Sequence, residues 1–257
     1  MNGLAQLLQI SQDILWLHAL VFLRVGPIIA LFPGFGEQYV PVRIKLVATL
    51  AFTVIVAPAA ASEMPYMTGP QFSFTWVIIT ETAIGLMIGI GLRMFLLALQ
   101  MAGSMAAQAT SLSQILGSAG ATPLPAIGHL LTMGGIALAM ILHLHVNVAA
   151  MVIATYKIFA VGQLPAASAM SQWGISQISQ AFSLAFSLAA PFVLISVLYN
   201  LTLGIINRAM PQMMVIFVGA PVITAGGLVL LFLLAPIMLG VWAAAFQAYI
   251  ANPFGLR

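Results

Sequence analysis

The sequence predicts an all-α integral membrane protein that forms one domain over residues 1–257. Of its 257 residues, 63% are hydrophobic and 4% are charged, whereas a soluble domain is about 45–50% apolar and about 25% charged. The mean hydropathy is +1.15. Seven Lys and Arg residues and four Asp and Glu residues are too few to cover a water-facing surface of this size. Most of the exterior is therefore expected to face membrane lipid or other apolar protein.

Apolar segments recur along the whole chain, separated by breaks rich in Gly, Pro, Ser and Gln. They lie at 14–32, 44–61, 74–100, 124–156, 181–206 and 214–250. A membrane-spanning helix needs about 20 apolar residues, so the pattern predicts a bundle of about six spans. Asp13 precedes the first segment, with no basic stretch before it and no small-residue cleavage site after it. We therefore expect this segment to be retained in the protein.

Two segments are too long for a single straight span. Residues 214–250 would make a helix of about 55 Å, against about 30 Å of hydrocarbon. Gly226, Gly227 and Pro236 lie inside that segment. The segment 124–156 has the same problem. Both are expected to form bent or hairpin-like pairs of helices, since proline and glycine interrupt helices.

Several functional classes are excluded by composition and spacing. A net charge of +3 forms no basic patch, which argues against nucleic-acid binding. The chain has no cysteine, and its four histidines lack the spacing of a helical metal pair; they are His18, His129, His143 and His145. Neither a nucleophile elbow, nor a P-loop, nor a dinucleotide-binding motif is present. We therefore expect no enzyme activity, no metal and no cofactor.

Charged residues inside the apolar segments are more informative. An ionised group there is costly and normally faces the protein interior. Glu81 is compatible with a proton pathway in a proton-coupled small-solute transporter. The sequence favours instead a structural ion pair of Glu81 with Arg24 or Arg93, or with a partner subunit. A transporter would usually carry more ionisable groups or a visible internal repeat.

Small and flexible side chains mark the third apolar segment. Gly85 and Gly89 form a GxxxG pair that lets helices approach closely, within the chain or between subunits. Met94, Met101 and Met105 fall within about 40° of one helical face. They are candidates for a deformable seal around a passing chain or for an ordinary packing stripe. Residues 103–123 are small, polar and uncharged, as expected of a water-accessible interior, a plug or an exposed loop.

Three ordered blocks of residues resemble a known family. The first contains Arg24–Gly26, Pro33–Gly36 and Val40–Lys45. The second has His145 before Thr155, Tyr156 and Gly162. The third is Leu203–Gln212 followed by Phe217–Pro221. These blocks, with the length and the apolar profile, resemble the FliR family of flagellar export-gate proteins, whose injectisome counterpart is the SctT family.

The resemblance implies a structural and gating subunit of the flagellar type III protein export channel, with an injectisome homologue as the alternative. Such a subunit packs into a larger helical export-gate complex with the P and Q components (FliP and FliQ), and is expected to meet FlhB and FlhA. The complex lies in the bacterial inner membrane, within the flagellar basal body and in contact with lipid. Unfolded flagellar subunits pass through its conduit, which is closed by a plug loop and a methionine-rich ring.

The resemblance also implies roles for individual residues. The plug maps onto the segment 106–123, with the candidates Ala106, Gln108, Ser111, Ser113, Gln114, Gly117, Gly120 and Pro123. The ring belongs mainly to the P component, so the three methionines named above are expected only to contribute to it. Candidates for structural or subunit contacts are Arg24, Pro41, Arg43, Glu81, Gly85, Gly89, Arg93, His145, Arg208, Pro211, Gln212 and Pro221.

Overall fold

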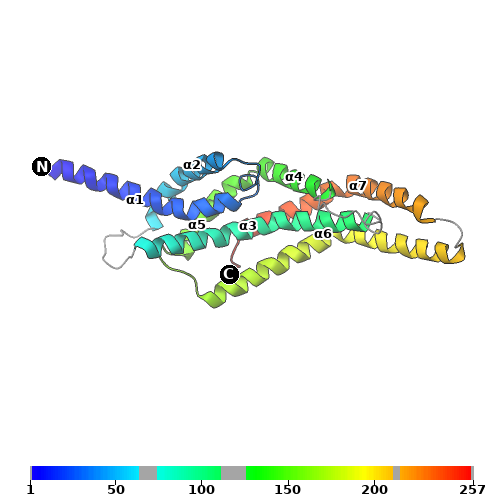
Figure 1. The fold of residues 1–257 in the computed structure, drawn as a ribbon. Coiled ribbons are helices and arrows are strands. Elements are labelled where there is room, and N and C mark those ends of the chain that lie inside the picture. The colour runs from blue at the N-terminus through cyan, green and yellow to red at the C-terminus, as the bar shows by residue number, and fades with distance from the viewer. Residues whose placement is uncertain (1, 64–73, 111–125, 211–214, 256–257) are drawn as a thin grey trace. The chain divides into compact units, whose positions relative to one another are not determined.

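The computed structural model describes residues 2–63, 74–110, 126–210 and 215–255, and in these ranges the chain is helical without a strand. The helices follow one another as shown in Figure 1. They are α1 (Asn2–Leu31), α2 (Val42–Ala60), the 3-10 turn η1 (Ala61–Glu63), α3 (Phe74–Thr110), α4 (Ala126–Ile141), α5 (Leu144–Ile158), α6 (Ala167–Ala209) and α7 (Val215–Ala251). The predicted all-α fold is confirmed.

Among the described helices, five are long and apolar enough to cross a membrane. They include α2, α3 and α6 in full, Leu8–Leu31 of α1 and Val222–Ala251 of α7. The pair α4 and α5 passes the same test as one broken span, which brings the number to six. The prediction of about six hydrophobic segments in an integral membrane protein is confirmed.

The break expected in the segment 124–156 lies between α4 and α5, whose axes meet at 70°. His143 caps α5 with a left-handed backbone (φ 53°), which directs the chain out of one helix and into the next. Its carbonyl oxygen then accepts from the amide of Val146 at 2.9 Å and starts the new helix. This long segment is bent, as predicted.

The segment 214–250 does not divide into a pair of helices, and that part of the prediction is wrong. The helix α7 runs without interruption across Gly226, Gly227 and Pro236. Its 37 residues correspond to about 55 Å, longer than the hydrocarbon layer of about 30 Å. Backbone groups that leave a helix in an apolar setting lose their partners at a cost of several kcal/mol each, so the helix persists through residues that would interrupt it in water.

The chain divides into two compact units, each with its own core. Unit 1 contains residues 1–93, 139–175 and 247–257, and unit 2 contains 94–138 and 176–246. The single-domain organisation stays a prediction. In unit 1, α2 packs against α1 and α5. In unit 2, the indole Nε1 of Trp242 donates to the carbonyl oxygen of Phe95 at 2.8 Å, and the rings of Phe95 and Phe246 stack 5.0 Å apart.

Unit 1 also contains a close helix crossing, between α1 and α3. A Cβ atom added to Gly85 would collide with the backbone oxygen of Arg24. One added to Gly89 would lie 3.0 Å from the backbone oxygen of Pro27. The GxxxG pair therefore faces α1 of the same chain. This close approach places the backbone of Arg24 against α3.

Candidate functional site

A fully buried ion pair lies at the centre of unit 1. The guanidinium of Arg24 (α1) donates from Nε to Oε2 of Glu81 (α3) at 2.7 Å, and from Nη2 to Oε1 at 3.1 Å. Both side chains have 0% exposure. This two-bond geometry is the strongest arrangement open to an arginine and a carboxylate. It joins α1 to α3 at one point in the apolar interior.

The remaining donors of Arg24 extend the cluster to α5. Nη1 donates to the hydroxyl of Thr155 at 3.3 Å, and Nη2 donates to the carbonyl oxygen of Phe159 at 3.0 Å. The guanidinium carbon also lies 3.8 Å from the centroid of the Tyr156 ring, a cation–π contact. Because these partners sit at the carboxyl end of α5, the helix dipole also favours the cation. Arg24 therefore holds α5 against α1.

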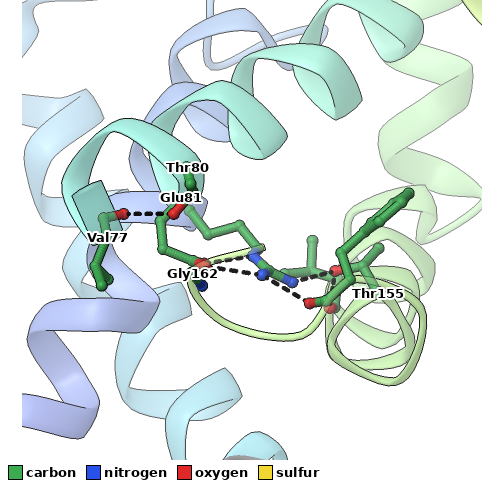
Figure 2. Close-up of polar contacts among 8 residues, drawn as sticks. Val77, Thr80, Glu81, Thr155 and Gly162 are labelled. Carbon is green, nitrogen blue, oxygen red and sulfur yellow. Dashed lines mark hydrogen bonds and ion pairs between the residues drawn. The ribbon is translucent and has the colours of Figure 1, made fainter. Parts of the chain in front are cut away.

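Glu81 holds the connection that follows α5. Its Oε1 accepts from the backbone amide of Gly162 at 3.2 Å, and the carbonyl oxygen of Gly162 accepts from Trp76 Nε1 at 3.1 Å. Gly162 has a positive φ of 79°, which favours glycine at this turn. Figure 2 shows Glu81, Thr155 and Gly162 gathered around this network. The carboxylate of Glu81 thus accepts three hydrogen bonds. These contacts favour a role in holding the helices together over a role in carrying protons.

The second intramembrane arginine has a different partner. Arg93 Nη1 lies 2.5 Å from Oε1 of Glu37, in the connection between α1 and α2. The two side chains are 23% and 10% exposed. Lys45 Nζ donates to the carbonyl oxygen of Gly36 at 3.1 Å, so the same connection is held at two points. Partial burial raises the pKa of Tyr39, with Glu37 acting in the same direction and Arg93 opposing it.

Three of the remaining contact candidates are exposed. Pro41 and Arg43 are exposed at the start of α2, and Arg208 is exposed in the last turn of α6. His145 is half-buried in α5, and its Nδ1 has no hydrogen-bond partner among the described residues. Pro211 and Gln212 lie outside the residues that the structure describes, and Pro221 lies in α7 without a described side chain.

The methionine and plug candidates follow one another along α3. Met94, Met101 and Met105 are each half-buried on this helix. Ala106 is buried and Gln108 is exposed in its last turns. The remaining plug candidates lie outside the described residues; they are Ser111, Ser113, Gln114, Gly117, Gly120 and Pro123. Of the predicted plug segment, the structure therefore describes only the residues that lie at the end of α3.

Sequence reasoning missed several residues of these polar contacts. Glu37, the partner of Arg93, was not expected to pair, because it lies outside the apolar segments, between two parts of the first resemblance block. Phe159 and Trp76 contribute through a backbone oxygen and an indole nitrogen, for which the sequence carries no distinctive signal. No three metal-ligating side chains gather in the ranges that the structure describes.

The whole chain is similar to proteins of bacterial export. Residues 15–249 match the family model described as Bacterial export proteins, family 1. The flagellar biosynthetic protein FliR of Caulobacter vibrioides is 31% identical over 249 residues, covering 96% of this chain and 97% of that protein. The FliR protein of Escherichia coli is 25% identical over 90% of each chain, and that of Aquifex aeolicus is 24% identical over 93% of each chain.

Proposed function

We propose a function from the premise that this chain belongs to the FliR family of bacterial export proteins. It is a subunit of the flagellar type III export gate, a multi-pass protein of the bacterial inner membrane. The observation that carries this conclusion is a match over nearly the full length of both chains. The matching proteins are named flagellar biosynthetic proteins. These names favour the flagellar system over the injectisome and a non-enzymatic role over catalysis.

The buried cluster argues against the alternative of a proton-coupled transporter. A coupling carboxylate must exchange its proton with water or with a neighbouring carrier. Glu81 instead has 0% exposure, an arginine on both oxygens and a backbone donor. Releasing it would leave Arg24 charged and unpaired in an apolar interior, which is costly. A structural role follows from the same contacts.

The partners that we propose are the P and Q components, FliP and FliQ, together with FlhB, FlhA and the unfolded flagellar export substrates. The support comes from the wide apolar faces that the chain leaves exposed. In the most hydropathic window of α7 only 22% of the residues are buried, and in that of α6 only 33%. Phe232 of α7 is 81% exposed and Ile175 of α6 is 68% exposed. Faces of this kind require lipid or other helices to cover them.

For the segment 106–123 we propose a plug that closes the conduit, and for Met94, Met101 and Met105 a contribution to the surrounding seal. The segment is small, polar and uncharged in a chain that is otherwise apolar. It starts inside the long helix α3, directly after the methionines. Uncharged polar groups can contact water in a conduit without the cost of placing a charge within the membrane.

The proposed function is tested by export and by leakage in the same cells. Loss of the chain should abolish secretion of flagellar rod and hook subunits, and the chain supplied from a plasmid should restore it. A variant that lacks residues 111–123 should admit a membrane-impermeant dye to the cytoplasm. Replacing the turn 163–166 by a Gly-Ser segment is the matched control and should admit none. Normal secretion without the chain would contradict the export role, and a sealed deletion variant would contradict the plug.

A further inference from the structure

One side of α2 carries an arginine followed by a row of apolar side chains. Four exposed residues lie there within about 60° of one another around the helix. Arg43 stands in the first turn of α2. The other three are apolar and follow it at intervals of about one turn; they are Val47, Leu50 and Val54. We call these four residues the α2 ridge.

The opposite side of α2 is covered by the rest of unit 1. The helix packs there against α1 and α5. Its buried residues are Thr49, Thr53, Val56, Ala57 and Ala60. All of them lie about 80° or more around the helix from Arg43. The α2 ridge therefore points away from these contacts and needs an occupant from outside the chain.

Arg43 differs from its neighbour Lys45 in the partner that each one finds. Lys45 Nζ donates to the carbonyl oxygen of Gly36 at 3.1 Å, so its charge is held within unit 1. The ion pairs among the described residues belong to Arg24 and Arg93, and Arg43 takes part in neither. The exposed guanidinium of Arg43 can therefore bind an anion from outside the chain.

The dimensions of the α2 ridge match one leaflet of a membrane. The helix has 19 residues and is long and apolar enough to cross a membrane. Its length of about 28 Å is close to the hydrocarbon thickness of about 30 Å, so its first turn lies at a membrane surface. From Arg43 to Val54 the ridge extends about 16 Å, about half of that thickness. Tyr39 is exposed just before the helix, and tyrosine is enriched at this level of a membrane.

We propose that the α2 ridge binds an anionic phospholipid, with the lipid phosphate at Arg43 and an acyl chain along the three apolar residues. Such a lipid presents the two groups that the ridge complements, a negative charge at the membrane surface and a hydrocarbon chain that extends through one leaflet. A zwitterionic lipid offers the same chain, but its headgroup has no net negative charge for Arg43 to attract. The proposal goes beyond the export role and concerns the membrane around the protein.

The test uses the full-length chain, purified in detergent with the proteins that accompany it, and native mass spectrometry. Phosphatidylglycerol and phosphatidylethanolamine are added in equal amounts, and we expect phosphatidylglycerol to be retained in preference. Arg43→Gln should lower the affinity for phosphatidylglycerol about fivefold, the effect of one basic residue near a membrane surface. Lys45→Gln is the matched control and should leave it unchanged, since Lys45 is held within the chain. Equal affinity in the two variants, or no preference between the two lipids, would overturn the proposal.

Two further measurements separate a phospholipid from other occupants. Glycerol phosphate has the headgroup without acyl chains and should not displace phosphatidylglycerol at equal concentration; displacement would show a phosphate site that does not use the apolar residues. A photoactivatable phosphatidylglycerol should attach to the peptide that contains the α2 ridge in the wild-type protein, so this result does not depend on the folding of a variant. A probe that attaches only elsewhere, because a helix of another subunit covers the ridge, would contradict the proposal.

Discussion

Replacing Glu81 by glutamine is expected to remove most of the folded protein from the membrane. The substitution leaves Arg24 charged and without its partner in an interior where both side chains have 0% exposure. Removing one member of such a pair costs about 3–5 kcal/mol, a large part of a stability of about 5–15 kcal/mol. The measurement is the amount of the chain in the inner-membrane fraction and the midpoint of its thermal unfolding after purification.

A variant in which both charged residues are replaced by apolar ones distinguishes a structural ion pair from a carboxylate that couples proton movement to transport. Arg24→Met with Glu81→Leu removes both charges together, which is often neutral in other proteins. Here it also leaves the carbonyl of Phe159 and the amide of Gly162 without these partners. We therefore expect a partial return of folded protein, and of export in proportion to it. A double variant that is abundant in the membrane but exports nothing would show that the Glu81 charge has a functional role beyond structure.

Replacing Gly85 by alanine should have a comparable effect at the same place. The added Cβ atom would collide with the backbone oxygen of Arg24, which cannot move aside as a flexible side chain could. We expect a loss of about 1–3 kcal/mol from overpacking, together with displacement of Arg24 from Glu81. The thermal midpoint of the purified chain should fall and the amount in the membrane should decrease.

Gly26→Ala is the matched control for Gly85→Ala. It lies in α1, two residues from Arg24, and its Cβ atom would meet Thr49 at an ordinary distance of 3.8 Å. We expect it to be neutral or slightly stabilising, since alanine is preferred to glycine within helices. Equal loss in the two variants would mean that the crossing of α1 and α3 does not depend on the close approach at Gly85.

The helical segments could be predicted because a membrane span has a simple requirement, about 20 consecutive apolar residues. A break within 124–156 was also predictable, since one straight helix over these residues would exceed the membrane, but its position at His143 was not. The continuity of α7 was not, because the effects of Gly226, Gly227 and Pro236 are known mainly from helices in water. In an apolar setting the cost of unpaired backbone groups outweighs them.

The buried charges were predictable as a group but not as pairs. Sequence places Arg24, Glu81 and Arg93 inside apolar segments, where each needs a partner. Which partner each one finds depends on how α1, α3 and the connection through Glu37 pack, and residues 57 positions apart in the chain carry no signal for that. The sequence suggested separate roles for Arg24 and for the mid-chain block that contains Thr155 and Gly162. In the structure these residues belong to one cluster, because Thr155 and Gly162 contact the ion pair of Arg24 and Glu81.

The most direct measurement is purification of the detergent-solubilised chain from cells that also produce the other export-gate proteins, followed by its native mass and composition. We expect a stable complex that contains this chain with the P and Q components, because its apolar faces remain uncovered when it is alone. A chain that elutes by itself or with further copies of itself, although those components are present in the same membranes, would contradict its role as a subunit of the export gate.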